Sequence, residues 1–421
     1  MFKDSRGTLL FPIKDNQYID KSINISKDCT YSINKKNVLR GLHINTFGKL
    51  ITCINGSFID FMIHPETLDF KYYYIKQGDQ IYCPGNYAHG FITLEENSIL
   101  SYHCEGFFGN EAGGLLNYKD PIVYELLMPI FDKYNIDETK LIMNDKDSNA
   151  PFLNFDYFLL GKNGFIGSYI LNELKNQNKK VYPLPFRLDD TKNIKKYIEA
   201  YKPKYLINAA GLTGTPDTKW CNTHQKQTLM TNVINQINIL NLCHEYNVHC
   251  TLIGSGAIFN SSKEPIYSHT KGNIVSTPEF PNYYAECRIM LEELIKPFNN
   301  CLLLRINYPL STKSNSKNLI NKLLMYPSIE NISLSVTFLD SMIPKLPKII
   351  EDNKTGIVNF VNQGQLNIPT FIQKYIDYYR VNMNKEYKDS DRESPKLICD
   401  NLDEYFIEDI NYALSKYIFK N

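Results

Sequence analysis

Two patterns of hydrophobic and polar positions divide this chain. Up to about residue 125, short apolar runs of β type, such as Leu50–Ile54 and Phe58–Ile63, are separated by turn residues. These turn residues are Asn55-Gly56, Gly78-Asp79 and Pro84-Gly85-Asn86. Strands that recur at about ten-residue spacing between such turns predict an all-β barrel or sandwich.

The pattern changes at Phe155. The run Phe155–Leu160 predicts a buried strand, and a helical pattern follows it through Leu174. Further on, strands are expected at 205–208, 250–253 and 301–304, and helices at 224–245 and 284–296. This alternation is typical of parallel βαβ units and predicts a Rossmann-type, doubly wound parallel sheet.

These patterns predict two domains, residues 1–130 and residues 154–421. A chain of 421 residues is long enough for two domains with separate cores. Residues 131–153 contain the polar stretch Asn144–Asn149 and are expected to form a linker.

Composition narrows the class of protein. The net charge of +1 gives no electrostatic basis for binding nucleic acid or an acidic membrane. The ten cysteines are scattered without a C-x-x-C pair, as in proteins with reduced thiols. Residues 1–7 lack a signal-peptide segment, and no apolar run reaches membrane-spanning length. We therefore expect a soluble, cytoplasmic protein.

The glycines Gly161, Gly164 and Gly167 stand between a predicted strand and a predicted helix. In that context they allow the backbone to approach a pyrophosphate, and the start of the helix supplies N–H donors. The alternative is a tight strand–helix turn without a ligand. Arg187 follows at about the distance where adenosine-ribose contacts fall, and its charge favours NADPH while leaving NADH open.

His43, His89 and Tyr102 each stand beside an apolar β pattern. Two histidines and a tyrosine that share a barrel interior indicate acid–base chemistry. A metal site built from His43, His89 and His103 is the alternative, but no His-x-His pair with a downstream glutamate supports it. We expect His64 and His103 to be structural or exposed to solvent.

Residues 2–130 resemble the nucleotide 4-keto-6-deoxyglucose 3,5-epimerases, which are jelly-roll (cupin-type) barrels. The motifs that carry this resemblance are Phe2-x-Asp4-x-Arg6-Gly7, Asn24-Ile25-Ser26, Lys36–His43, Pro84-x-x-x-Ala88-His89-Gly90-Phe91, Tyr102 and Asp120-Pro121. After Asp60, however, His64-Pro65-Glu66 replaces an Asp-x-Arg stretch of the family. The choice between C3 alone and both C3 and C5 therefore stays open.

The chemistry of such an epimerase can be assigned to particular residues. Hydrogens at C3 and C5 are acidic because they flank a C4 ketone, so a base and an enolate stabiliser are needed. We expect His43 to take the proton, with Asp120 orienting its ring, and Lys49 to stabilise the enolate oxygen. Tyr102 would return a proton from the opposite face. The residues expected to position the nucleotide sugar are Arg40 and His89.

From about Phe158 onward the chain is similar to the plant-type nucleotide-rhamnose synthase and to dTDP-4-dehydrorhamnose reductase, which are extended short-chain dehydrogenases. The motifs are Asn208–Pro216, Trp220-Cys221, Thr231-Asn232-Val233, Gly254–Phe259, Arg305–Pro309 and Thr337–Asp340. The resemblance implies that Ser255 and Tyr284 are the catalytic hydroxyl pair, with Tyr284 donating a proton to the C4 oxygen. Residues expected at the cofactor are Gly161, Gly164, Phe165, Ile166, Gly167, Arg187, Asn208, Ala209, Ala210 and Asn232, and Thr213 is expected at the substrate.

Two positions depart from the plant-type pattern. Arg288 stands where the family has a lysine that grips the nicotinamide ribose and stabilises the tyrosine anion; it keeps the charge but has a different shape. Ala257 replaces a cysteine assigned to epimerisation, and alanine cannot transfer protons. Epimerisation is therefore expected in the barrel.

These observations predict a bifunctional enzyme that epimerises and then reduces, with NADPH, a UDP-4-keto-6-deoxyhexose, either plain or 2-acetamido. The product would be a UDP-6-deoxy-L-hexose such as UDP-L-rhamnose or its 2-acetamido analogue, with a dTDP-sugar as the alternative substrate. Two other functions stay open: an epimerase alone, or a non-catalytic sugar-nucleotide-binding protein. Barrels of this type commonly form dimers, so a homodimer is expected.

Overall fold

The computed structural model divides the chain into two units, Met1–Leu153 and Asn154–Asn421. It describes residues 2–4, 7–9, 28–106, 112–214, 217–260, 264–390 and 394–420. The motif residues Arg6, Asn24–Ser26 and Thr215–Pro216 lie outside the described residues. The two-domain prediction is confirmed, and each unit is described by itself.

The first unit contains two antiparallel sheets, as the alternation of apolar runs and turns predicted. The four-stranded sheet has the order β3 (Asp28–Asn34), β10 (Ser98–Cys104), β5 (Lys49–Asn55), β8 (Gln80–Cys83). The five-stranded sheet has the order β11 (Ala112–Leu115), β4 (Leu39–Asn45), β9 (Ala88–Thr93), β6 (Ser57–Ile63), β7 (Phe70–Lys76). A separate pair is formed by β1 (Phe2–Asp4) and β2 (Gly7–Leu9).

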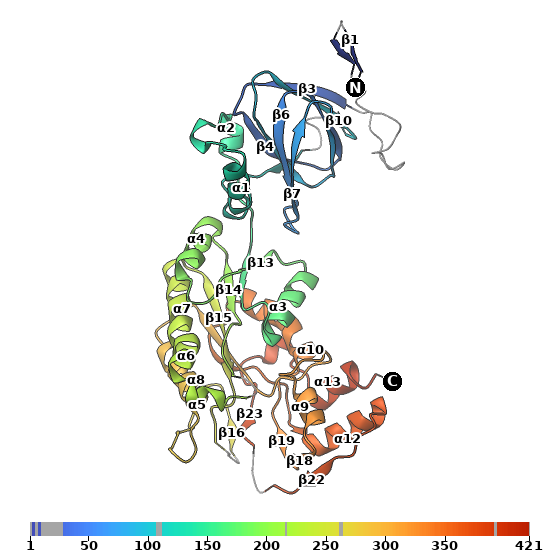
Figure 1. The fold of residues 1–421 in the computed structure, drawn as a ribbon. Helices are drawn as coiled ribbons and strands as arrows, with labels where there is room; N and C mark the ends of the chain where they lie inside the picture. Colours follow the sequence, from blue (N-terminus) through green and yellow to red (C-terminus); the bar gives the residue numbers. More distant parts are fainter. Residues whose placement is uncertain are drawn as a thin grey trace. The chain divides into compact units, whose positions relative to one another are not determined.

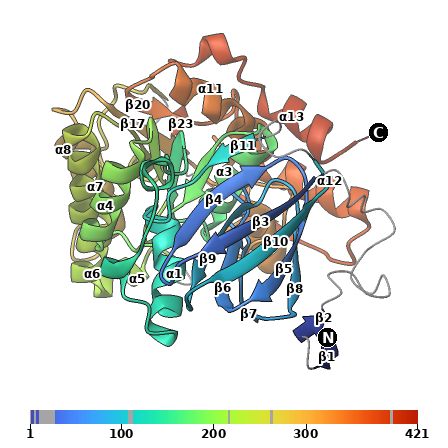
Figure 2. The same ribbon diagram turned by 90° about the horizontal axis from the view of Figure 1, so that it is seen from above.

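The two sheets face each other across an apolar core (Figure 2). Ile51 and Leu100 come from the four-stranded sheet, and Phe58, Met62 and Phe91 come from the five-stranded sheet. Residues of one face alternate along each strand with residues of the other. The outward face of the five-stranded sheet is therefore available to a second apolar layer.

That second layer comes from the segment after the strands. It contains α1 (Pro121–Lys133), the 3-10 turn η1 (Glu138–Lys140) and α2 (Asp145–Ser148). Val123, Leu127 and Phe131 of α1 pack on Leu39 and Ile59 of the sheet. The backbone N–H of Leu39 also donates to Ile142 O at 3.0 Å. The prediction that residues 131–153 form a linker is wrong, because this segment belongs to the first unit.

The second unit is built on a six-stranded parallel sheet, which confirms the predicted doubly wound sheet. Its order is β13 (Val181–Pro183), β12 (Tyr157–Leu160), β14 (Tyr205–Asn208), β15 (His249–Ser255), β17 (Cys301–Ile306), β20 (Gly356–Asn359). The strand order changes direction between β12 and β14. Ligands of doubly wound sheets bind at such a switch point, beyond the carboxyl ends of the strands.

Helices cover both faces of this sheet (Figure 1). One face carries α3 (Phe165–Asn176), α10 (Leu339–Met342), η3 (Ile343–Lys345) and α11 (Leu346–Glu351), which share an apolar cluster with the strands. The other face carries α4 (Thr191–Tyr201), α7 (Asn235–Glu245) and α8 (Tyr283–Leu294). Before α7 the chain forms α5 (Trp220–Thr223), α6 (Gln225–Leu229) and the π-helical turn η2 (Met230–Ile234).

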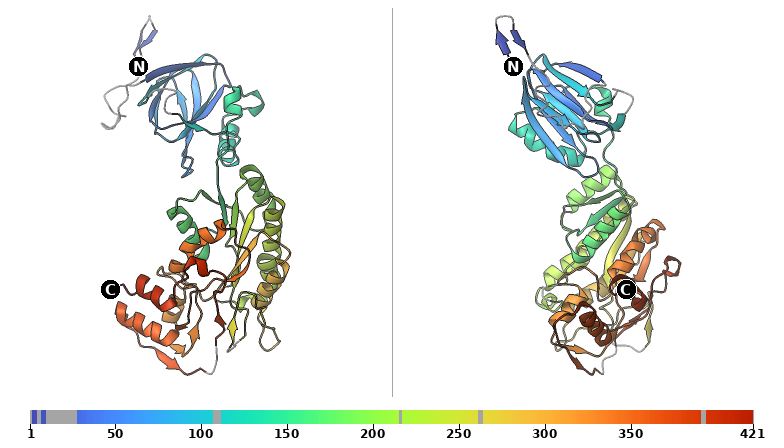
Figure 3. Two further views of the ribbon diagram at one scale, coloured as in Figure 1. Left: turned by 180° about the vertical axis from the view of Figure 1, so that it is seen from behind. Right: turned by 90° about the vertical axis from the view of Figure 1, so that its right-hand side faces the viewer.

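A further apolar cluster gathers the helices near the C-terminus (Figure 3, orange to red). These helices are α9 (Leu319–Met325), α12 (Ile368–Tyr379) and α13 (Ile410–Tyr417). The remaining short elements are β16 (Pro265–Ile266), β18 (Ser328–Glu330), β19 (Ser333–Leu334), β21 (Leu366–Asn367), β22 (Glu386–Lys388), β23 (Lys396–Leu397) and η4 (Asp403–Tyr405). In the described part of the chain, no helix combines the length and hydrophobicity needed to cross a membrane.

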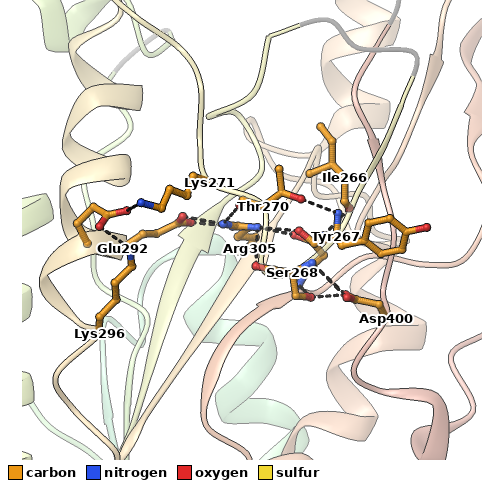
Figure 4. Close-up of polar contacts among 11 residues, drawn as sticks. Ile266, Tyr267, Ser268, Thr270, Lys271, Glu292, Lys296, Arg305 and Asp400 are labelled. Carbon is orange, nitrogen blue, oxygen red and sulfur yellow. Dashed lines mark hydrogen bonds and ion pairs between the residues drawn. The ribbon is translucent and has the colours of Figure 1, made fainter.

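Arg305 on β17 ties several of these elements together (Figure 4). Its guanidinium, only 1% exposed, donates to both carboxylate oxygens of Glu292 on α8 at 2.7 Å. It also donates to the carbonyl oxygens of Ser268 and Thr270, at 3.2 and 2.8 Å, and to Asn359 Oδ1 at 3.1 Å. A buried ion pair is tolerated when its remaining donors are satisfied, as they are here. The network fixes the position of α8 against the sheet.

Candidate active sites

The first unit has a cavity of about 300 Å³ lined by residues of both sheets. Five of the residues predicted from sequence line it: Arg40, His43, Lys49, His89 and Tyr102. His43 on β4 and His89 on β9 are direct partners in the strand register. The fold therefore brings together side chains that are up to 62 positions apart in sequence (from position 40 to position 102).

His43 is held by a buried carboxylate. Its Nε2 lies 2.8 Å from Oδ1 of Asp147, and the other oxygen of Asp147 accepts the N–H of Gly41 at 3.1 Å. Asp147 is 1% exposed, whereas the His43 side chain is 36% exposed. A carboxylate that accepts from one ring nitrogen leaves the other nitrogen as the proton acceptor. His43 is thus oriented as a base.

The prediction that Asp120 orients His43 is wrong. Asp120 is the N-cap of α1, where its Oδ1 accepts from the N–H of Ile122 at 2.9 Å. Its Oδ2 accepts from the N–H of Leu153 at 2.8 Å. The partner of His43 comes instead from α2, in the polar stretch that was expected to be a linker.

A second histidine–carboxylate pair lies deeper in the cavity wall. His89 Nε2 is 2.8 Å from Asp60 Oδ2, and both side chains are buried. Burial lowers the pKa of His89, and the charge of Asp60 opposes this shift. Asp60 Oδ1 has no hydrogen-bond partner among the described residues. Asp60 was not predicted as a site residue, and its position on a strand with an apolar pattern hid it.

Lys49 places a buried cation in the same cavity. Burial lowers the pKa of its ammonium, while Cys83 and Asp60 act in the opposite direction. An amine whose charged form is poorly solvated by water interacts strongly with a developing oxyanion. Lys49 is therefore suited to stabilise an enolate oxygen.

Tyr102 and Arg40 complete the cavity. The Tyr102 hydroxyl lies 3.4 Å from Ser32 Oγ, and burial raises the pKa of Tyr102, which keeps it protonated. Arg40 is exposed, and its Nε donates to Asn34 Oδ1 at 2.7 Å. An exposed guanidinium at the rim suits the binding of a phosphate.

Among residues 28–106 and the other described ranges, no cluster of three or more potential ligands could hold a metal ion.

The second unit places the predicted glycine turn between β12 and α3. Gly161 has a φ of +81°, and a Cβ there would lie 2.5 Å from Ala210 N. A Cβ on Gly167 would lie 2.1 Å from Gly161 O. Gly164 is the N-cap of α3 and supplies no side-chain cap, so the first N–H groups of the helix are not used by it. This turn fits a dinucleotide pyrophosphate, for which such N–H groups are the usual donors.

The cofactor residues predicted around this turn are close to it, but they contribute differently. Phe165 packs edge-to-face on Tyr169 in the core, so only its backbone faces a ligand. Asn208 at the end of β14 accepts from the N–H of Ala210 at 3.1 Å and thereby shapes the segment against Gly161. Ala209 donates its N–H to Leu160 O at 3.0 Å.

Two other predicted site residues, Arg187 and Thr213, lie outside the glycine turn. The Arg187 side chain is 86% exposed and its Nε is 3.4 Å from Asp189 Oδ1, so that pair would have to open before Arg187 could bind a 2′-phosphate. Thr213 lies beyond the glycine turn, and its hydroxyl accepts from Lys317 Nζ at 3.0 Å.

Ser255 ends β15, and Tyr284 and Arg288 lie one turn apart on α8. All three side chains are buried. Ser255 Oγ accepts from the N–H of Ala257 at 3.1 Å. The Arg288 guanidinium carbon is 5.2 Å from the centre of the Tyr284 ring, which places the cation over the aromatic face.

Arg288 is held in place by its surroundings. Its Nη1 donates to Ile253 O at 3.2 Å, and its Nη2 lies 3.4 Å from Asn232 Oδ1. A Cβ on Gly211 would lie only 2.9 Å from that Nη2, so glycine makes room for the guanidinium. Asn232 also bonds the N–H and the carbonyl oxygen of Leu212, at 2.8 and 2.7 Å. Arg288 Nε is buried and has no hydrogen-bond partner in the described structure.

Comparison with known proteins agrees with this arrangement. Residues 1–154 match the dTDP-4-dehydrorhamnose 3,5-epimerase family, and residues 157–301 match the NAD dependent epimerase/dehydratase family. The solved UDP-rhamnose synthase of Acanthamoeba polyphaga mimivirus shares the fold, with a TM-score of 0.56 and 24% identity over 62% of this chain and 97% of that one.

Relatives in Arabidopsis thaliana are more similar in sequence. A bifunctional dTDP-4-dehydrorhamnose 3,5-epimerase/dTDP-4-dehydrorhamnose reductase is 33% identical over 229 residues, which are 53% of this chain and 76% of that protein. A trifunctional UDP-glucose 4,6-dehydratase/UDP-4-keto-6-deoxy-D-glucose 3,5-epimerase/UDP-4-keto-L-rhamnose-reductase is 30% identical over 259 residues, 60% of this chain but only 38% of its own length. Both resemblances drawn from the sequence are confirmed, and the chain belongs to the family of bifunctional 3,5-epimerase/4-reductase enzymes.

Proposed function

We propose that the first unit epimerises a nucleotide-linked 4-keto-6-deoxyhexose and that the second unit reduces its C4 ketone with NADPH. The observation that supports this proposal most directly is that one cavity holds a carboxylate-oriented histidine, a buried lysine and a protonated tyrosine. The two facing antiparallel sheets support a jelly-roll barrel for this unit.

In the epimerase, His43 takes a proton from the carbon next to the ketone, and Asp147 stabilises the imidazolium that forms. The electron pair moves to the C4 oxygen, where the Lys49 ammonium stabilises the enolate. Tyr102 then donates its proton to the opposite face of the same carbon, which inverts it. Proton exchange with water restores His43 and Tyr102.

In the reductase, the glycine turn and the first turn of α3 would hold the dinucleotide, which supplies a hydride when bound. Tyr284 donates a proton to the C4 oxygen, and Ser255 holds that oxygen by a hydrogen bond. The Arg288 cation over the Tyr284 ring stabilises the tyrosine anion left behind. Its free Nε is a donor for a ribose hydroxyl.

A UDP-sugar is the preferred substrate, because two of the similar proteins are named for UDP-linked sugars. The product would be a UDP-6-deoxy-L-hexose such as UDP-L-rhamnose or its 2-acetamido analogue. A dTDP-sugar is the alternative, since other relatives are named for it.

The role of Asp147 can be tested by deuterium exchange. UDP-4-keto-6-deoxyglucose incubated with the protein in D₂O, without cofactor, should gain deuterium at C3, C5 or both. Asp147→Asn should slow this exchange by about 100-fold, because His43 loses the carboxylate that orients it. Asp120→Asn is the matched control and should stay within about threefold of wild type, since Asp120 accepts from the N–H groups of Ile122 and Leu153 rather than from His43. Wild-type exchange by Asp147→Asn would refute the assignment.

The alkaline limb of the exchange reaction should report Lys49. Because burial lowers the pKa of Lys49, its charge is lost as pH rises through a value below the ordinary 10.5. The rate should fall over that range, while the raised pKa of Tyr102 keeps the tyrosine protonated. Lys49→Arg retains its charge and should lose this limb in a pH–rate profile. If the rate of Lys49→Arg still falls over the same pH range, the titrating group is not Lys49.

The reductase assignment depends on Tyr284. Tyr284→Phe should lower NADPH oxidation by at least about 100-fold, because the proton donor to C4 is removed. Deuterium exchange measured without cofactor should be unchanged in this variant. Undiminished NADPH oxidation by Tyr284→Phe would exclude Tyr284 as the donor. If the wild type exchanges deuterium but does not oxidise NADPH, the protein is an epimerase only.

We also infer that the protein is a homodimer. Strand β3 lies at the edge of the four-stranded sheet and exposes Tyr31 and Ile33, by 61% and 69%, beside the cavity that they help to line. A second copy that covers this edge would bury both side chains. Sedimentation equilibrium should give twice the chain mass of 48.8 kDa for the wild type and a smaller value for Ile33→Lys. A monomeric wild type would contradict the inference.

A further inference from the structure

The loop between β17 and α9 is held rigidly by its own side chains. Asn318, 1% exposed, donates through Nδ2 to the carbonyl oxygens of Ser311 and Lys313, each at 2.8 Å. Its Oδ1 accepts from the N–H of Ser311 at 3.2 Å. The Ser311 hydroxyl in turn accepts from the N–H of Lys313 at 2.8 Å. The backbone of the loop is therefore ordered before any ligand arrives.

Contacts with two helices fix where the loop lies. The N–H of Thr312 donates to Asp340 Oδ2 on α10 at 2.9 Å. The Ser311 hydroxyl also bonds the Tyr169 hydroxyl on α3. A loop anchored in this way can present side chains at defined positions with little loss of conformational entropy on binding.

Lys317 is the residue that this loop extends toward the reductase site. It is exposed, and its ammonium donates to the Thr213 hydroxyl at 3.0 Å, across 104 positions of sequence. Among the ion pairs of the described residues, none involves Lys317. A neutral hydroxyl satisfies one donor of an ammonium and leaves its charge uncompensated.

Thr213 belongs to a segment that contacts both halves of the reductase site. The segment 208–213 begins against the dinucleotide turn, where Gly161 abuts Ala210. It continues past Gly211, which abuts the Arg288 guanidinium. Thr213 follows two residues later, so Lys317 reaches a segment that passes both the glycine turn and Arg288.

We propose that Lys317, together with the Thr213 hydroxyl, binds the diphosphate of the nucleotide sugar in the reductase site. This inference rests on the proposed function, since it names how that site holds its substrate. The reacting sugar is uncharged, whereas its diphosphate carries two negative charges that a free lysine complements. NADPH also carries a diphosphate, so the alternative is that Lys317 binds the cofactor instead of the sugar nucleotide.

Steady-state kinetics and cofactor binding distinguish the diphosphate of the sugar nucleotide from that of NADPH. UDP-4-keto-6-deoxyglucose is first incubated with the two-unit protein until epimerisation is complete, and NADPH is then added. Lys317→Gln should raise KM for the sugar about tenfold or more, with kcat within about twofold, because a charge-assisted contact to a distant group is lost. The Kd for NADPH, from its fluorescence on binding, should change by less than about twofold. Lys317→Arg should restore most of the affinity.

Lys313→Gln is the matched control on the same loop. Its ammonium lies 4.8 Å from the centre of the Tyr169 ring rather than at Thr213, so KM for the sugar should stay within about twofold. An unchanged KM in Lys317→Gln, equal effects of both variants, or a weakened Kd for NADPH would overturn the inference. A wild type that does not oxidise NADPH would instead refute the proposed function.

Discussion

The buried carboxylate of Asp147 is the contact on which the first unit depends. It joins α2 to β4 by accepting from the His43 ring and from the Gly41 backbone at once. The same contact attaches the segment after α1 to the five-stranded sheet and, in the proposed reaction, would orient the base. Since a buried carboxylate is costly without partners, the two donors stabilise both the fold and the reactive form of the histidine.

The second unit couples its scaffold to its site in a similar way. Arg305 anchors α8 through Glu292, and the same helix carries Tyr284 and Arg288. A Cβ at position 211 would lie 2.9 Å from Arg288 Nη2, so the glycine leaves room for the guanidinium. Alanine at position 257 cannot transfer a proton, so the proposed function assigns inversion to the first unit. Under that proposal the two chemistries are divided between two folds.

Strong periodic signals allowed the sequence to predict most of the architecture. The turn dipeptides and β runs predicted the strands around His43 and Tyr102, and the glycine turn predicted the connection between β12 and α3. The carboxylates were harder to assign, because hydrogen bonds between distant segments leave no local pattern. Asp120 precedes a proline as a helix cap does, and Asp147 stands in a polar stretch that resembles a linker. Asn144, which caps α2, was the available sign that this stretch folds.

The proposed combination of epimerisation and reduction is tested most directly by the isotope pattern of the complete reaction. Wild-type protein would convert UDP-4-keto-6-deoxyglucose in D₂O with NADPH, and the product would be analysed by NMR. An L-configured 6-deoxyhexose with deuterium at the inverted carbons and hydrogen from NADPH at C4 is expected. A reduced sugar of unchanged configuration and without deuterium at C3 or C5 would contradict an epimerase in the first unit.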